Sequence, residues 1–331
     1  MQGPGIRPKQ RVIFIFTQSD AQAANVWAQD FIGQFNAHMR EWELDGELPP
    51  VDYIVSADAY DDLQLKLAYH PAIRKAGDNP PLLITIGDHA SAEVCRYRVL
   101  YGKTNIPQLF CITGDPCKLD LITMDDQLVA NTNGVCAIDA QTVKKQLRTL
   151  RSLNRSVTSI GVLSGMNCRS DLVAVQKEET LTKWRKAAEG LNMKVSRVHL
   201  FEEMDVEAHL LTMIGQHQAF ILLKDDTVFS FAEKIGKFCD THGITLLASD
   251  LSLVAHGAAL GYGNAAGDFV APLIDLMAQW FEHNLPLNAF ELALLQEPTQ
   301  MWHNIEHVRL QVPHLSPEVE DMLEMYPIHL R

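Results

Sequence analysis

The residues that could do chemistry in this sequence are hydroxyls, amides and carboxylates that directly follow buried, strand-like runs. For example, the run Gln108–Ile112 is followed by Thr113 and Asp115, and the pattern recurs in both halves of the chain. The candidates are Thr17, Gln18, Gly87, Asp88, Thr113 and Asp115 in the first half, and Ser164, Asp225, Asp226, Thr227 and Asp250 in the second. Because ligands of open parallel sheets bind beyond the carboxyl ends of the strands, these groups predict a site for a small polar ligand.

Each of these groups also has a purely structural explanation. Ser, Thr, Asp and Asn commonly cap helices, since their side-chain oxygens accept hydrogen bonds from the unpaired N–H groups of the first turn. Those same N–H groups point into the space where a ligand would bind. The recurrence of the pattern at strand ends in both halves favours a polar cleft between them over capping alone.

Other kinds of functional site are weakly represented. The sequence has no G-x-x-x-x-G-K-[ST] phosphate loop, and the glycines from Gly261 to Gly267 are spaced one residue away from the dinucleotide fingerprint, which disfavours a dinucleotide-dependent enzyme. His303 and His307, with Glu306 beside them, would lie one helical turn apart and could hold a metal. No third ligand is evident, so a solvated helix face is expected instead. We therefore predict no catalytic residue, no metal and no cofactor.

Two series of strand-like runs would carry the polar groups. The runs are short and apolar throughout, as expected for strands covered on both faces of a parallel sheet. They span 11–16, 51–55, 82–86 and 108–112 in the first series, and 159–163, 194–200, 218–223 and 244–248 in the second. Amphipathic stretches lie between them, such as 142–153, whose apolar residues recur at helical spacing. This alternation predicts an α/β fold with two doubly wound parallel-sheet lobes.

The two lobes are expected to be joined by a three-segment hinge. No Gly/Ser-rich linker separates the halves, and the extended segments 131–139, 257–263 and 290–298 are interpreted as crossings between them. Lobe 1 is then expected to comprise residues 1–136 and 257–288. Lobe 2 is expected to comprise residues 137–256 and 289–331.

Composition limits the class of partner. The chain has 331 residues, of which 47% are hydrophobic, and 28 basic against 41 acidic residues give a net charge of −13. This acidic balance argues against nucleic acid or an anionic membrane surface as a partner, because phosphate contacts need a surplus of Lys and Arg. No run approaches the roughly 20 apolar residues of a membrane span, so no membrane insertion is expected.

The N-terminus and the cysteines bear on localisation and redox state. The first ten residues contain no hydrophobic signal region, so we expect a cytoplasmic protein, or a periplasmic one whose export signal was trimmed. The six cysteines show no metal-binding spacing, and reduced, partly buried thiols are expected. A pairing of Cys111 with Cys117, which flank one polar turn, stays an open alternative.

Four motifs resemble one known family. They are Ile106–Pro107 with Phe110 and Asp115–Pro116; Lys145–Gln146–Leu147 followed by Ile160–Leu163; Asp225 with Thr227 and Val228; and Ala248, Ser249 and Asp250 followed by Gly257 and Ala258. Their order and spacing are similar to those of substrate-binding proteins of ABC importers, in the group that includes tryptophan- and tyrosine-binding lipoproteins. The resemblance extends from about Arg11 to the C-terminal region.

The resemblance implies a type I periplasmic-binding-protein fold that closes around a small polar or amino-acid-like ligand in the interlobe cleft. It implies no catalysis, and an ABC permease and ATPase as partners. The chain departs from the family at Asp88 and Asp226, where the family has Thr and Asn, and only Asp139 could replace an aspartate missing from the first crossing segment. The extra carboxylates favour a ligand with a cationic group. The alternative is a sensor that uses the same fold without transport.

Overall fold

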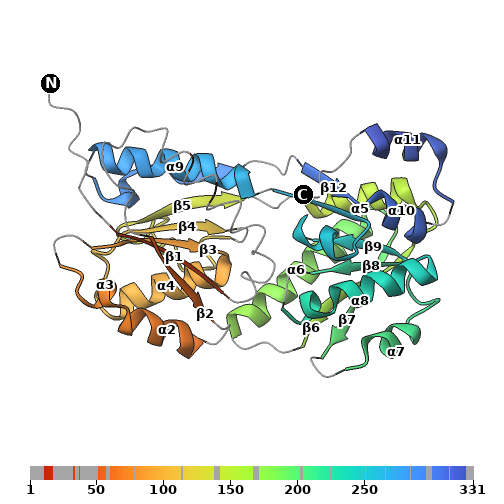
Figure 1. Cartoon of the computed structure of the whole chain (residues 1–331), viewed down its shortest axis with the longest axis horizontal. Helices are drawn as coiled ribbons and strands as arrows, with labels where there is room; N and C mark the ends of the chain where they lie inside the picture. Colours follow the sequence, from red (N-terminus) through yellow and green to blue (C-terminus); the bar gives the residue numbers. More distant parts are fainter. Residues whose placement is uncertain are drawn as a thin grey trace. The chain divides into compact units, whose positions relative to one another are not determined.

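Two compact α/β units make up the protein, whose structure is a computed structural model (Figure 1). Unit 1 comprises Met1–Asp139 and Ala265–Glu297, and unit 2 comprises Ala140–Asn264 and Pro298–Arg331, so the chain passes between the units three times. The described residues are 11–17, 33, 37, 51–56, 60–77, 80–112, 115–137, 142–166, 171–201, 204–223, 226–249, 251–264, 266–283, 285–295, 300–312 and 314–325.

Six described strands form a parallel sheet in unit 1, in the order β11-β5-β4-β3-β1-β2. They are β1 (Val12–Thr17), β2 (Val51–Ser56), β3 (Leu82–Ile86), β4 (Gln108–Ile112), β5 (Thr132–Ala137) and β11 (Ala293–Leu295). The helices are α2 (Tyr60–Tyr69), α3 (Pro71–Arg74), α4 (Asp88–Leu100), α9 (Ala266–His283) and the short 3-10 helix η2 (Leu287–Ala289). Apolar residues of α9 pack on one face of the sheet, and those of α2, α3 and α4 pack on the other.

Six described strands also form the sheet of unit 2, in the order β12-β10-β9-β8-β6-β7. They are β6 (Ser159–Gly165), β7 (Lys194–Leu200), β8 (Ala219–Leu222), β9 (Thr245–Ala248), β10 (Leu260–Gly263) and β12 (Gln300–His303). The helices are α5 (Thr142–Leu153), α6 (Asp171–Glu189), α7 (Val206–Leu211), α8 (Asp226–His242), the 3-10 helix η1 (Leu251–His256), α10 (Ile305–Gln311) and α11 (Pro317–Met325). One face packs on α5, α6, α10 and α11, and the other on α7, α8 and η1.

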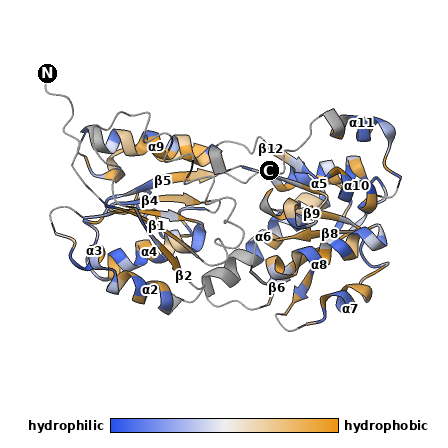
Figure 2. Ribbon diagram, in the orientation of Figure 1, coloured by the Kyte–Doolittle hydropathy of each residue, from blue (hydrophilic) through white to orange (hydrophobic). Residues whose placement is uncertain are grey.

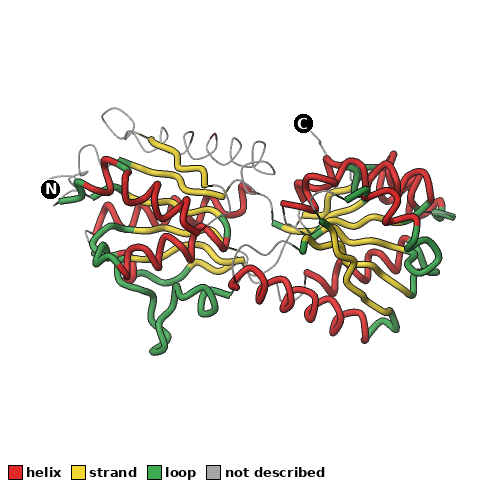
Figure 3. Tube along the Cα trace, turned by 90° about the horizontal axis from the view of Figure 1, so that it is seen from below, coloured by secondary structure: helices red, strands yellow, loops and turns green. Residues whose placement is uncertain are grey.

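The predicted secondary structure agrees with these units. All eight predicted strands are present, and the predicted apolar stripe of α5 is buried at Val143, Leu147, Leu150 and Leu153. Apolar colouring follows the strands and the inner sides of the helices, which cover the sheets in each unit (Figures 2 and 3). The prediction of two α/β lobes with parallel sheets is confirmed. One strand differs, because β12 runs antiparallel to β10.

Each segment interpreted as a crossing contributes a strand to one of the sheets, and the chain passes between the units near the end of each segment. The first contains β5, all six residues of which are buried. The other two contain β10, which pairs with β9 in unit 2, and β11, which pairs with β5 in unit 1. These pairings keep residues 260–263 in unit 2 and residues 293–295 in unit 1, so the second and third boundaries between units fall later in the chain than expected.

A buried arginine joins the amino ends of β4 and β5. Arg98 is 0% exposed, and its guanidinium donates to Gln108 Oε1 at 3.0 Å, to Thr132 Oγ1 at 2.6 Å and to the carbonyl of Ala130 at 2.8 Å. Burial lowers the pKa of Arg98 to about 10. These acceptors are neutral, so dipoles rather than a carboxylate stabilise this charge.

None of the described helices combines the length and the apolar character needed to cross a membrane.

Candidate functional site

The carboxyl ends of neighbouring strands bring predicted residues together in unit 1. Strands β1, β3 and β4 lie side by side, with Phe16 opposite Ile86 and Ile86 opposite Cys111. The residues that end or follow these strands therefore share one edge of the sheet. Of the candidates, Thr17, Gly87, Asp88 and Asp115 are found there.

Gly87 and Asp88 form the turn from β3 into α4. Gly87 has φ 90° and ψ 157°, a left-handed conformation that favours glycine. Its N–H donates to the carbonyl of Cys111 at 2.9 Å, which ties the turn to β4. Its own carbonyl accepts from the Ser91 hydroxyl at 2.7 Å. Asp88 opens the helix and is half-buried, in a position where the helix dipole favours a negative charge.

The carboxylate of Asp115 accepts a hydrogen bond within the turn that Asp115 begins. Asp115 is exposed, and its Oδ1 accepts from the backbone N–H of Cys117 at 3.0 Å. The Asp115 carbonyl accepts from the N–H groups of Lys118 and Leu119 in the same turn. This is the capping arrangement that was the alternative explanation for the polar turns.

Unit 2 repeats the arrangement on its own sheet. Strands β6, β8 and β9 are neighbours, so Ser164 in β6 and the start of α8, which follows β8, lie at the carboxyl edge. Ser164 is 1% exposed, and its hydroxyl makes no hydrogen bond to the protein. Asp226 is the first residue of α8, and Thr227 beside it is 6% exposed. Among the candidates whose side chains the structure describes, Ser164 has a buried hydroxyl without a hydrogen-bond partner.

Five candidates lie outside the described residues: Gln18, Thr113, Asp139, Asp225 and Asp250. The described candidates lie at the carboxyl edge of the sheet in unit 1 or at the carboxyl edge of the sheet in unit 2. A ligand site that uses both edges stays a prediction.

Sequence reasoning missed His199, which is the register partner of Ser164 on β7. The two side chains lie on the same face of the sheet, and the Nδ1 of His199 is buried without a hydrogen-bond partner. Burial, together with the charge of Arg197, lowers the pKa of His199. The signal in the sequence was a histidine at the position before the last residue of a predicted strand, rather than in the turn that follows it.

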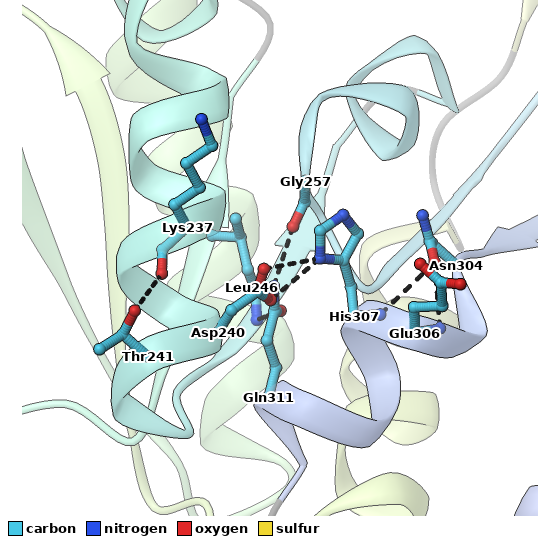
Figure 4. A network of polar contacts seen from close by, with 9 residues as sticks. All are labelled: Lys237, Asp240, Thr241, Leu246, Gly257, Asn304, Glu306, His307 and Gln311. Carbon is cyan, nitrogen blue, oxygen red and sulfur yellow. Dashed lines mark hydrogen bonds and ion pairs between the residues drawn. The ribbon is translucent and has the colours of Figure 1, made fainter.

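The predicted placement of His303 and His307 on one helix face is wrong. His303 ends β12 and is 4% exposed, whereas α10 begins only at Ile305, after Asn304, whose side chain caps it by accepting from the N–H of Glu306 at 3.0 Å. His307 contacts the Asp240 carboxylate of α8 at 2.9 Å (Figure 4), so it is not a solvated helix residue. Among the described residues, no three His, Cys, Asp or Glu side chains are placed to hold a metal ion.

A cavity of about 770 Å³ in unit 1 lies away from these residues. Its lining includes Arg11, Asp52, His70 and Pro81, which lie at or near the amino ends of β1, β2 and β3. Arg11 and Asp52 form an ion pair, with His70 Nε2 3.6 Å from the same carboxylate. This cavity belongs to the opposite edge of the sheet from the predicted site.

The described cysteines are free thiols. Cys95, Cys111, Cys136 and Cys239 are buried and Cys117 is exposed. The alternative pairing of Cys111 with Cys117 is therefore wrong, because Cys111 is enclosed within β4.

Comparison with known proteins identifies the family. A family model described as ABC transporter substrate binding protein matches residues 68–269. No curated protein sequence matches the chain.

Solved structures of low sequence identity share the fold. The chain is similar to an ABC domain in complex with L-Trp from Streptococcus pneumonia (14% identity, TM-score 0.71, covering 95% of this chain and 98% of that one). It is also similar to a ligand-free, open substrate binding protein with adhesive properties from Clostridium difficile (16% identity, TM-score 0.65, covering 92% and 96%). A third is an arabinose binding protein from Geobacillus stearothermophilus (10% identity, TM-score 0.56, covering 92% and 99%).

These likenesses confirm the type I periplasmic-binding-protein fold. Because the family model matches more than half of the residues, the chain belongs to the family of ABC transporter substrate-binding proteins.

Proposed function

We propose that this protein captures a small polar or amino-acid-like ligand outside the cytoplasm and delivers it to an ABC permease with its ATPase. The family match carries this proposal, since members of the family bind a substrate for a transporter. The structural relative that binds L-Trp supports an amino-acid-like ligand.

The proposed ligand contacts are the polar groups at the carboxyl edges of both units. Unit 1 would contribute Thr17, Gln18, Gly87, Asp88, Thr113, Asp115 and Asp139. Unit 2 would contribute Ser164, Asp225, Asp226, Thr227 and Asp250. Contacts from both units are required because a ligand stabilises a closed form only by binding it more tightly than the open form. The carboxylates among these groups favour a ligand with an ammonium or similar cationic group.

Native mass spectrometry of the purified full chain, followed by calorimetry with L-amino acids and related amines, tests the proposal. We expect one small molecule to bind with a stoichiometry of about one per chain, as a single site requires. Absence of both a co-purified molecule and binding to the panel would contradict solute capture.

Single substitutions test the contact residues. Ser164→Ala and Thr227→Val each remove one hydroxyl, and loss of one neutral hydrogen bond should weaken binding by roughly 2- to 12-fold. The matched controls are Ser152→Ala and Thr241→Val, on exposed positions of α5 and α8. Equal affinities for all four variants would remove Ser164 and Thr227 from the site while leaving solute capture intact.

A sensor that uses the same fold without a permease is the second candidate. The free thiols of the five described cysteines favour it, because exported proteins use unpaired cysteines sparingly. Ligand uptake by cells that produce the protein, compared with uptake by cells from which it has been deleted, distinguishes the two. Uptake that depends on this protein supports transport, and ligand binding without uptake supports sensing.

A further inference from the structure

Unpartnered polar atoms concentrate at the outer edge of the unit 2 sheet. Among the described residues, twelve buried side-chain nitrogen and oxygen atoms make no hydrogen bond to the protein. Four of the twelve belong to just three residues: Arg197 Nε and Nη2, His199 Nδ1 and His209 Nε2. Buried polar groups are nearly always paired in folded proteins, so such a concentration in one place points to a partner that is not part of the chain.

The fold brings Arg197 and His199 to one face of the sheet edge, with His209 within electrostatic range of His199 on a helix that packs on the other face. Arg197 and His199 are two residues apart on β7, so their side chains lie on the same face of the sheet. β7 is the last strand of the sheet on this side, and His209 lies on α7, the next helix along the chain (Figure 1). After burial, the charges that act on the His199 imidazole are those of Arg197, Glu178 and His209, with Glu178 opposing the other two in their effect on the pKa of His199.

The guanidinium of Arg197 has one occupied and one unoccupied edge. Its Nη1 pairs with the carboxylate of Glu178 on α6. Its Nε and Nη2 present two parallel N–H donors that no protein acceptor uses. This edge is the one that binds a carboxylate or phosphate group through two hydrogen bonds.

The cluster borders solvent, although the four unpartnered nitrogen atoms themselves are buried, so an anion reaches them only when these side chains move. The Arg197 side chain is 18% exposed, and His199 and His209 are half-buried. Both histidines can donate a hydrogen bond from the ring nitrogen that now lacks a partner, and both gain a positive charge on protonation. Among the described residues, the Glu178 carboxylate pairs with Arg197, and its side chain is 59% exposed.

We propose that Arg197, His199 and His209 form a binding site for an oxyanion, either a carboxylate or a phosphate-like group, at the outer edge of unit 2. The bidentate edge of Arg197 holds the anion, and the two imidazoles add donors beside it. Protonation of either imidazole strengthens binding, so affinity rises as the pH falls. None of the three residues is among the predicted ligand contacts, although His199 lies beside Ser164 in the sheet.

Titration of the full chain with sulfate and, separately, with acetate tests the proposal. Ionic strength is held constant with sodium chloride, and the imidazole NMR signals of His199, His209 and His242 are followed. Sulfate keeps its charge between about pH 6 and pH 7.5, so a change in affinity over that range reports on the histidines. We expect saturable shifts of His199 and His209 with tighter binding at the lower pH, while His242 on α8 stays unchanged. Saturation by acetate alone would assign the site to carboxylates, and saturation by sulfate alone to phosphate-like groups.

Two substitutions are expected to change the affinity for the anion in opposite directions. Arg197→Met should weaken anion binding at least about tenfold, whereas Arg309→Met, which removes another arginine paired with a glutamate, should change it by less than about twofold. Glu178→Gln should tighten binding, because it removes the competing carboxylate from a largely exposed position. Non-saturating shifts, or unchanged affinity in both Arg197→Met and Glu178→Gln, would overturn the proposal.

Discussion

Replacing Gln311 with Leu tests the polar network that joins α8, α10 and the residue after η1 (Figure 4). Gln311 is 0% exposed, and its Oε1 accepts from the N–H of Leu246 at 2.9 Å. Its Nε2 donates to Asp240 Oδ1 at 2.8 Å and to the carbonyl of Gly257 at 2.9 Å. Leucine has a similar volume and removes all three hydrogen bonds at once.

The magnitude follows from what the substitution leaves behind. The N–H of Leu246 and the carbonyl of Gly257 lose this amide partner inside the unit, and a buried unsatisfied group costs about 1–3 kcal/mol. Asp240 keeps its contact with His307, and the apolar leucine offsets part of the loss. We expect a net decrease of about 2–4 kcal/mol in the free energy of unfolding, out of a typical total of about 5–15 kcal/mol.

Urea denaturation and amide hydrogen exchange of the full chain measure this effect. The transition of unit 2 should move to lower urea concentration, and the Leu246 amide should lose protection from exchange. Leu310→Ala, at the neighbouring 55% exposed position of α10, should stay within about 0.5 kcal/mol of the wild type. A Gln311→Leu protein with wild-type stability and full protection at Leu246 would refute the reasoning.

Three further predictions concern pH, packing and thiol reactivity. Burial lowers the pKa of His217 and of His303, so the unfolded chain takes up protons that the folded chain does not, and stability measured in urea should decrease as the pH falls below about 6.5. Gly134→Ala should prevent stable folding of unit 1, measured by thermal unfolding, because the added Cβ would lie 2.2 Å from the Phe110 carbonyl oxygen. Cys117 should be the one described cysteine that a thiol reagent modifies in the native protein, and slowly, because desolvation and the nearby carboxylates of Asp115 and Asp126 raise the pKa of its thiol.

The carboxyl ends of the strands show which features of the candidate site could be predicted from the sequence. An apolar run followed by a glycine and a carboxylate predicted the end of β3 at Ile86 and the turn at Gly87. The same pattern could not tell a ligand contact from a cap, because both use the same oxygen atoms. In the structure, Asp115 is engaged in its own turn, while the Ser164 hydroxyl has no partner in the protein.

Hydrophobic periodicity and turn residues do not reveal side chains whose partners lie far away along the chain. Arg98 belongs to none of the sequence patterns, and its acceptor Thr132 is 34 residues away along the chain. His307 was expected on a solvated helix face, but it meets Asp240, 67 residues earlier. Local spacing carries no information on such pairs, because they exist only after the sheets have assembled.

The sequence by itself determined the alternation of strands and helices, the two parallel sheets and the polar residues at their carboxyl edges. These follow from hydrophobic periodicity and turn chemistry, which act over a few residues. The tertiary structure decided which unit the short strands β10 and β11 join, how Arg98 and Gln311 are satisfied, and that Arg197 and His199 lie on an edge strand with unpartnered nitrogen atoms. Those outcomes depend on strand pairing and burial between segments far apart in the chain, and only the folded protein brings such segments together.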